Sequence, residues 1–231
     1  MRAVAVVPSY REAGTISRTV SSLLTLEGIE RVVVIDDASG DRTAREASKA
    51  GATVVVNGRN LGKGGSVNRV AGELDFEALL LIDGDIGEHA IEARSILEPV
   101  FGGRADLAIA SFGPALQKGG FGLVKGLARG GIMWLAGREM ASPISGQRAM
   151  TRGAYLEVAP FARGFGMEVA MTIDALRAGL NVIEVPTTMS HVETGRDLAG
   201  FLHRGKQFCQ ILVALLRRAV LPGRLFASTG D

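Results

Sequence analysis

The sequence predicts an α/β protein with a mostly parallel central sheet flanked by helices. Short apolar runs at 3–7, 31–36, 53–56 and 79–82 have the length of strands buried on both faces. Segments with helical spacing of apolar residues separate these runs, and such alternation implies right-handed crossovers between parallel strands. Polar or glycine residues follow each run, so we expect them to meet at one rim of the sheet, where open α/β sheets bind ligands.

The elements are expected in a simple order. After the first strand come a helix at 15–26, the second strand, a short polar helix ending at 50 and the third strand. A glycine-rich loop at 57–65 opens the next helix, and the strand at 79–82 follows. The second half is less regular, and its predicted elements are a helix at 88–100, strands at 106–110 and 145–150, a helix at 165–178, a strand at 181–188 and a long helix at 197–220. The glycine-rich segment 111–131 is expected to be a lid or binding loop, with a helix in its latter part as the alternative.

Composition limits the classes of protein that fit. The chain has 231 residues, 47% of them hydrophobic, which is enough for one large domain. Its net charge of +2 is too weak to indicate nucleic-acid binding. Cys209 is the single cysteine, so no intrachain disulfide forms, and its apolar surroundings predict a small core residue. We find no signal peptide and no apolar run long enough to span a bilayer, so a cytoplasmic protein is expected.

Two acids separated by one glycine follow the apolar run at 79–82. The carboxylates of Asp83 and Asp85 repel one another unless a cation lies between them, and Mg²⁺ or Mn²⁺ suits such oxygen ligands. Gly84 lets the turn tighten and a ligand approach the backbone. The alternative is an ordinary surface turn.

Other polar residues are expected near this rim. Lys63 lies among glycines at a helix start and could hold a phosphate, although the motif fails the P-loop pattern. Asp37 could face a ligand while Asp41 caps the next helix. His191, just past a predicted strand, could complete a metal shell, and a plain loop histidine is the alternative. Serine-hydrolase and zinc-binding motifs are absent, as is the glycine fingerprint of dinucleotide-binding folds.

Five motifs occur in the order found in one enzyme family. They are residues 7–12 (VPSYRE), 34–41 (VIDDASGD), 60–64 (NLGKG), 83–85 (DGD) and 145–148 (SGQR). Over nearly its whole length the chain resembles family 2 glycosyltransferases of the GT-A fold. Its first half resembles dolichyl-phosphate-mannose synthases. Residues 160–169, followed by His191, resemble glucosyl-3-phosphoglycerate synthases, which are longer than this chain.

The resemblance implies a function. It predicts a single GT-A domain over 1–231, with a nucleotide-sugar-binding half at 1–110 and an acceptor-side half with a C-terminal helix at 111–231. The expected reaction moves a hexose from a UDP- or GDP-sugar to a phosphorylated acceptor, either polyprenyl phosphate or a phosphoglycerate-like molecule. Mg²⁺ or Mn²⁺ would be the cofactor.

The resemblance also implies roles for single residues. Asp85 would bind the metal directly, with Asp83 toward the ribose or the metal and His191 as the further ligand. Glu168 would be the base or would position the acceptor, and its alternative is a structural carboxylate at a helix start. The residues expected to bind the nucleotide sugar are Pro8, Tyr10, Glu12, Asp37, Lys63, Asp83, Gly84, Arg148 and Arg196. The two arginines are candidates for binding the diphosphate or the acceptor phosphate, because arginine pairs with phosphate bidentately.

Alternatives remain at two points. A nucleotidyltransferase shares a similar fold, but residues 8–12 lack the glycine- and arginine-rich loop that such enzymes usually carry, and a non-catalytic nucleotide-sugar-binding protein is a third hypothesis. The final helix carries apolar residues with basic neighbours. Packing on the core or on a second subunit, as in a homodimer, is favoured, and peripheral contact with an anionic membrane surface is the alternative.

Overall fold

The computed structural model describes residues 1–112, 122–189 and 198–220. Within this part of the chain, strands form one seven-stranded sheet in the order β3-β2-β1-β4-β6-β5-β7. The strands are β1 (Ala3–Ser9), β2 (Ile29–Asp36), β3 (Thr53–Val56), β4 (Ala78–Leu81), β5 (Leu107–Phe112), β6 (Arg148–Thr151) and β7 (Val182–Thr187). The fold class predicted from the sequence is therefore confirmed.

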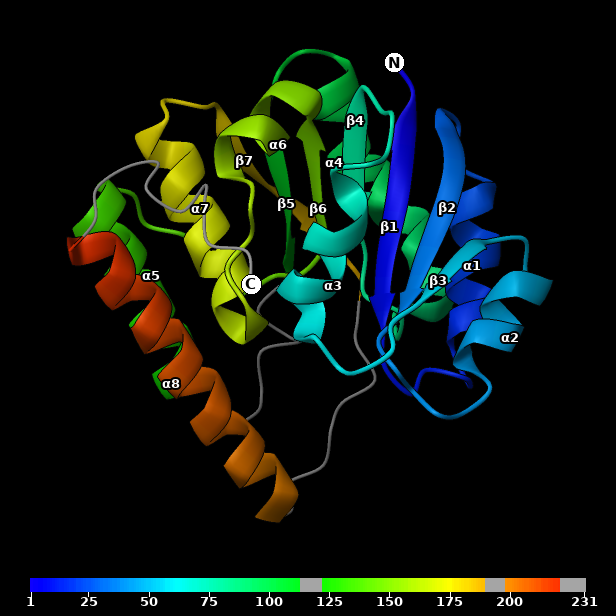
Figure 1. The fold of residues 1–231 in the computed structure, drawn as a ribbon. Helices are drawn as coiled ribbons and strands as arrows, with labels where there is room; N and C mark the ends of the chain where they lie inside the picture. The colour runs from blue at the N-terminus through cyan, green and yellow to red at the C-terminus, as the bar shows by residue number, and fades with distance from the viewer. Residues whose placement is uncertain (113–121, 190–197, 221–231) are drawn as a thin grey trace.

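Helices cover both faces of the sheet, as Figure 1 shows. They are α1 (Ile16–Leu24), α2 (Thr43–Lys49), α3 (Gly62–Ala71), α4 (Arg94–Phe101), α5 (Gly122–Ala136), α6 (Arg152–Val158), α7 (Met167–Arg177) and α8 (Leu198–Val220), with 3₁₀ turns η1 (Gly87–Ala93) and η3 (Gly164–Gly166). None of these described helices is long and apolar enough to cross a membrane.

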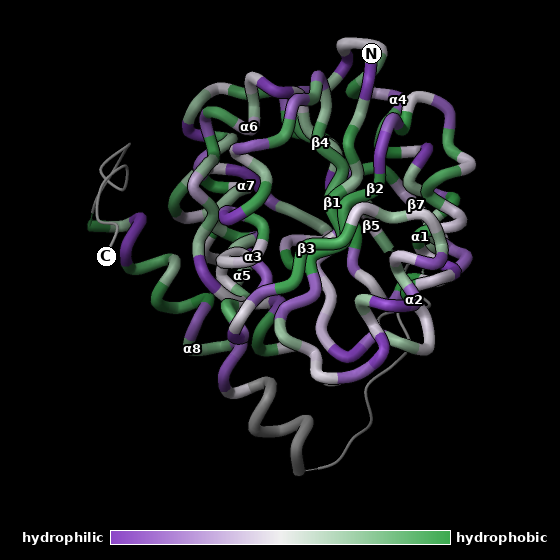
Figure 2. Tube along the Cα trace, turned by 45° about the vertical axis from the view of Figure 1, so that its right-hand side comes forward, coloured by the Kyte–Doolittle hydropathy of each residue, from purple (hydrophilic) through white to green (hydrophobic). Residues whose placement is uncertain are grey.

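Each strand divides its side chains between two cores. On β1, Val4 and Val6 face the core made with α3, α5, α6, α7 and α8, whereas Ala5 and Val7 face the core made with α1 and α4. Such burial on both faces explains why the strands appear in the sequence as unbroken apolar runs. Figure 2 shows this hydrophobic interior as green in the central strands.

One strand runs against the others. β6 pairs antiparallel with both β4 and β5, while β1 pairs parallel with β2 and β4. The start of β6 therefore lies beside the end of β4, with Arg148 opposite Leu81. This reversal brings residues of the second half of the chain to the same rim as the first half.

Three local points follow from the structure. Residues 122–136 form the helix α5, so the helical alternative for the latter part of the segment 111–131 is confirmed, and residues 113–121 lie outside the described residues. The short helix α6 was not anticipated from the sequence. Cys209 is exposed on α8 rather than buried in the core. The prediction that α8 packs on the core is confirmed, because Ile211, Ala214 and Leu215 are buried.

Candidate functional site

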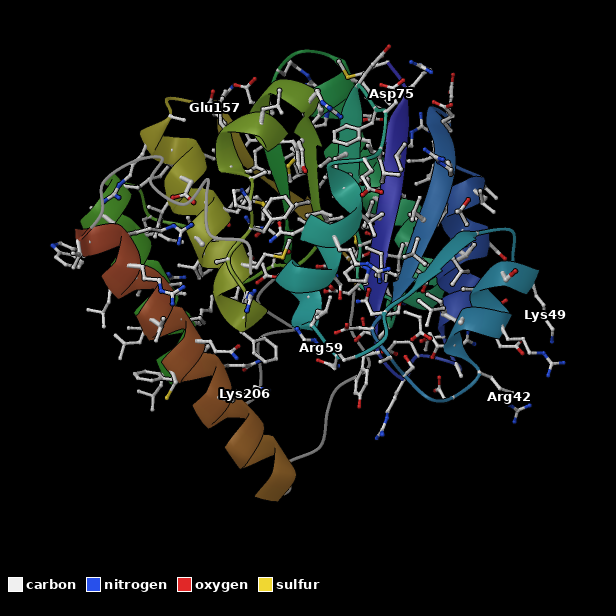
Figure 3. The ribbon with its side chains drawn as sticks, in the orientation of Figure 1. Arg42, Lys49, Arg59, Asp75, Glu157 and Lys206 are labelled. Atoms are coloured by element: carbon white, nitrogen blue, oxygen red, sulfur yellow. The ribbon has the colours of Figure 1, made fainter. Side chains whose placement is uncertain are left out.

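The candidate site lies at the rim where β1, β2 and β4 end and β6 begins. Asp37 follows β2, Asp83 and Asp85 follow β4, and Gln147 precedes β6. Arg59, labelled in Figure 3, marks the loop before α3 at this lower edge of the molecule. The rim thus gathers polar residues from both halves of the chain, as the sequence predicted.

Lys63, in the first turn of α3, joins three elements of this rim. Its Nζ lies 2.5 Å from Asp83 Oδ1 and 2.9 Å from Glu168 Oε1. Burial opposes the charge of the ammonium, but the two carboxylates outweigh it and raise the pKa of Lys63 above its ordinary value. The lysine therefore remains a cation between the end of β4 and the start of α7.

Asp83 is held at its second oxygen as well. Gln147 Nε2 donates to Asp83 Oδ2 at 3.0 Å. The Gln147 side chain is fully buried, and its Oε1 has no hydrogen-bond partner. Gln147 is not among the residues expected at the site, although its position in the Ser-Gly-Gln-Arg motif is a signal that could have found it.

Glu12 and Asp85 bring further negative charge to the same place. Burial and the neighbouring carboxylates of Asp85 and Asp83 raise the pKa of Glu12 above its ordinary value. A Cβ built on Gly84 would lie 2.5 Å from Ser9 Oγ and 3.3 Å from Glu12 Cγ. Glycine at position 84 therefore lets the acidic turn lie directly against the end of β1.

The described residues provide only part of the coordination shell of a hard divalent cation. Asp83 and Asp85 offer carboxylate oxygens. Their negative charge helps to raise the pKa of Glu12, and a bound cation would offset that charge. Among the residues that the structure describes, no group of three or more His, Cys, Asp or Glu side chains is arranged to hold a metal ion. The expected further ligand, His191, and the expected phosphate ligand, Arg196, both lie outside the described residues.

Asp37 has different partners from those expected. Its Oδ1 accepts hydrogen bonds from Leu61 N and Asn57 Nδ2, each at 2.8 Å, and its Oδ2 accepts one from Gly62 N at 2.7 Å. The carboxylate is buried and fixes the loop that presents Lys63. The second part of the expectation is confirmed, since Asp41 accepts a hydrogen bond from Thr43 N at 2.9 Å at the start of α2.

Arg148, expected to bind a phosphate, lies beneath the rim. The side chain is fully buried, and its guanidinium donates to Ser145 O at 2.8 Å, Thr172 Oγ1 at 2.9 Å and Pro143 O at 3.4 Å. Burial lowers the pKa of Arg148 to about 10, against the opposing effect of nearby acids. Arg148 therefore supports the rim from beneath.

Glu168 lies in the first turn of α7, where a carboxylate suits the helix dipole. It is largely buried, with its side chain turned to Lys63. The turn η3 before it is held by α8, because Gln210 Oε1 accepts a hydrogen bond from Phe165 N at 2.9 Å. Glu168 can therefore act as a structural carboxylate at the start of α7 and still lie beside the rim.

Pro8 and Tyr10 lie at the end of β1. Pro8 is half-buried within the strand, and Tyr10 is 44% exposed just beyond it. The Arg11 guanidinium lies 5.2 Å from the centroid of the Tyr10 ring, a cation–π distance. An exposed ring at this rim is available for stacking.

Gly146 provides a direct test of the Lys63–Asp83 pair. A Cβ at this position would overlap both Lys63 Nζ and the Asp83 carboxylate. We expect Gly146→Ala to separate the pair and to weaken ligand binding at the rim by about tenfold, or about 1.4 kcal/mol. Isothermal titration with nucleotide ligands would measure this loss. Gly153→Ala is the control, because its Cβ would meet only Thr151 Oγ1 at 3.8 Å, and equal affinities in the two variants would contradict the expectation.

Comparisons with known proteins agree with this geometry. Residues 4–123 match the family model described as "Glycosyl transferase family 2". Glycosyltransferase AglJ of Haloferax volcanii is 30% identical, over 82% of this chain and 63% of its own length. Undecaprenyl-phosphate mannosyltransferase of Micrococcus luteus is 27% identical, over 85% of this chain and 87% of its own length. This chain therefore spans less than two thirds of the length of AglJ.

A solved structure has a similar fold. The crystal structure of glucosyl-3-phosphoglycerate synthase from Mycobacterium tuberculosis, in complex with Mn²⁺, UDP and glucosyl-3-phosphoglycerate, superposes with a TM-score of 0.80. The similarity covers 96% of this chain and 81% of the other, at 24% sequence identity. At this identity the likeness establishes the fold.

Proposed function

Because this chain belongs to glycosyl transferase family 2, we propose that it moves a hexose from a UDP- or GDP-sugar to a phosphorylated acceptor. The observation that carries the proposal is the cluster of Lys63, Asp83, Asp85 and Glu12 at the rim of a sheet of this fold. Lys63 is half-buried beside several carboxylates, and groups with perturbed pKa values such as Lys63 and Glu12 cluster at functional sites. Nucleoside diphosphates carry the phosphates that such a rim would recognise.

Mg²⁺ or Mn²⁺ is the cofactor that we propose. Asp85 would be the main carboxylate ligand, with Asp83 beside it and His191 as the further ligand. Bound there, the ion would stabilise the negative charge that develops on the departing diphosphate. The Mn²⁺ complex of the M. tuberculosis synthase supports this choice.

The protein's own side chains have separate tasks in this proposal. Lys63 and the N–H groups at the start of α3 would bind the diphosphate, since a helix start attracts anions. Lys63 would then exchange part of its contact with Asp83 for the phosphate oxygens, which would release Asp83 toward the ribose or the ion. Tyr10 and Glu12 would lie along the nucleoside.

The role that we propose for Glu168 is narrower than that of a general base. The Lys63 ammonium lies 2.9 Å from its carboxylate, so this carboxylate is already paired with a cation. We assign Glu168 to orienting the donor sugar or the acceptor through hydrogen bonds, with proton acceptance as the second candidate. Measuring transfer by Glu168→Gln across pH separates the two, since a lost base would remove the acidic limb of the pH profile.

The experiment that tests the proposal is product analysis. Purified protein is incubated with UDP- or GDP-hexoses, Mn²⁺ and either a polyprenyl phosphate or 3-phosphoglycerate, and nucleotide products are separated by chromatography. We expect free nucleoside diphosphate and a glycosylated acceptor. Release of pyrophosphate would instead identify a nucleotidyltransferase.

Binding of nucleotide sugars without turnover would instead support the third hypothesis, a non-catalytic nucleotide-sugar-binding protein. A thermal-shift screen of nucleotide sugars with and without Mn²⁺ detects binding, because a ligand that binds the native state raises its apparent stability. A metal-dependent shift without product for any acceptor class would favour a nucleotide-sugar-binding protein. No shift and no product would refute the proposed function.

A further inference from the structure

We propose that the outer face of α5 and α8 is a docking surface for an anionic lipid bilayer. The face is defined here as the exposed apolar side chains of these two helices and is called the α5–α8 face. Its members are Leu123, Met133, Trp134, Phe208, Leu212, Val213, Leu216 and Val220. Most of the large exposed hydrophobic residues of the described chain therefore lie on two neighbouring helices.

The two helices present these residues side by side. A Cβ on Gly131 of α5 would collide with the Leu215 side chain of α8, so the helices are in direct contact there. Trp134 follows Gly131 by three positions, and Leu212 precedes Leu215 by three, so each lies on the side of its helix that meets the other. The exposed side chains thus form one continuous surface, and Figure 1 shows α8 in front of α5 at the outer edge of the molecule.

Packing among the residues that the structure describes does not explain this surface. The inward side of α8, with Ile211, Ala214 and Leu215, is buried in the core. Phe208, Leu212 and Leu216 form a second stripe at spacings of four, and all three remain exposed. An exposed apolar surface on an otherwise packed helix marks a contact with something outside the chain.

Charge distinguishes between the candidate occupants. Neither α5 nor α8 contains an acidic residue, whereas Lys206 and Arg217 are exposed at the border of the stripe. The acidic residue just beyond α5, Glu139, lies 3.5 Å from Arg129. Figure 3 shows Lys206 on the outer side of α8.

A second copy of the chain does not suit this charge pattern. A two-fold interface places the same patch against itself, so basic borders would face basic borders without acids between them. Anionic phospholipid head groups supply the complementary charge, and an amphipathic helix with basic flanks lies in such a surface. Trp134, 71% exposed, is of the residue type enriched at membrane–water interfaces.

The placement of the face relative to the rim extends the proposed function. α8 holds η3 through Gln210, and α7 with Glu168 begins directly after η3. A bilayer on the α5–α8 face would bring lipid-linked phosphates close to the acceptor side of the rim. The choice of a lipid acceptor rests on the proposed function, whereas the docking itself does not.

The sequence provides two unique reporters on this surface. Trp134 is the only tryptophan and Cys209 the only cysteine of the chain, and both are exposed on the α5–α8 face. The unmodified full chain is titrated with vesicles of phosphatidylcholine, with or without phosphatidylglycerol, while tryptophan emission is recorded. We expect a blue shift and quenching by brominated lipid only with phosphatidylglycerol present, and a loss of the shift at high salt. An environment-sensitive maleimide on Cys209 should respond in parallel.

Variants connect the signal to the residues. Leu212→Glu combined with Leu216→Glu should weaken vesicle binding by at least about tenfold, through lost apolar burial and added charge. Lys206→Glu combined with Arg217→Glu should weaken binding to anionic vesicles to a similar extent. Ile91→Glu is the matched control, since Ile91 is an exposed apolar residue on η1, and its binding should equal that of the wild type.

Three results would overturn the proposal. The first is the absence of any vesicle-dependent change in Trp134 emission. The second is equal binding to neutral and anionic vesicles. The third is a lipid-free blue shift that grows with protein concentration, together with a dimer in sedimentation that Leu212→Glu and Leu216→Glu dissociate, which would identify a second copy as the occupant. None of these measurements needs turnover. The docking proposal can therefore fail while nucleoside diphosphate release still supports the proposed function, and the reverse.

Discussion

Asp85→Asn should reduce sugar transfer by about 10³-fold or more while leaving the fold intact. Charge stabilisation of a leaving diphosphate by a bound ion is worth several kcal/mol, and each 1.36 kcal/mol changes a rate tenfold. The substitution keeps the size of the side chain and removes one of the charges that raise the pKa of Glu12. Stability should therefore change little, and steady-state kinetics with Mn²⁺ together with urea unfolding would measure both quantities.

Asp75→Asn is the control for removal of an acid. Asp75, labelled in Figure 3, is 93% exposed and lies far from the rim, at the opposite end of the strands. Its rate and its Mn²⁺ dependence should match those of the wild type. If Asp85→Asn retained more than about a tenth of the wild-type rate, the assignment of Asp85 as the main metal ligand would be wrong.

Arg148→Met should have the largest effect on stability. The substitution leaves the acceptors of Ser145, Thr172 and Pro143 without a donor inside the core, and it removes a buried charge that opposes Glu168 and Asp83. Loss of such a buried cation costs about 3 kcal/mol or more. Arg148→Lys should recover little, because an ammonium cannot reproduce the planar fork of donors.

Arg94→Met separates this effect from the loss of any arginine. Arg94 is exposed on α4 and pairs with Glu98 at 2.9 Å, so its removal should change stability by less than about 0.5 kcal/mol. Urea unfolding compares the variants, and titration with nucleotide sugar well below the unfolding midpoint compares their affinities. A stable Arg148→Met protein that no longer binds donor would support a direct phosphate contact and contradict the buried role.

The sequence was informative about the fold because burial on both faces leaves a simple pattern. Apolar runs such as 79–82 have no polar side to obscure them, and the predicted strands agree with the structure to within a few residues. The direction of β6 left no comparable signal. Its antiparallel pairing with β4 depends on how the chain returns from α5, which is a tertiary property. Helix α6 was missed because it has only seven residues, too few for a clear period.

The sequence predicts where the site lies better than it predicts which side chains contact one another there. Position after a strand predicted that Asp83 and Asp85 lie at the rim, and the glycine-rich helix start predicted the same of Lys63, whose ammonium contacts Asp83. Position alone could not reveal where a side chain points, so Asp37 and Arg148 were assigned to the ligand although both are buried beneath the rim. Gln147 was missed for the same reason, since its bond to Asp83 exists only through the β4–β6 pairing.

The antiparallel strand β6 determines which segment could be exchanged between homologous proteins. β5 ends at Phe112 and β6 begins at Arg148, and their pairing places both of these positions at the rim. The described part of the connection between them, residues 122–147, contains both α5 and Gln147. A homologous segment could be grafted across these two points without altering strand register, so Gln147 and the α5 part of the α5–α8 face would be exchanged together, while α8 and Glu168 would stay in place.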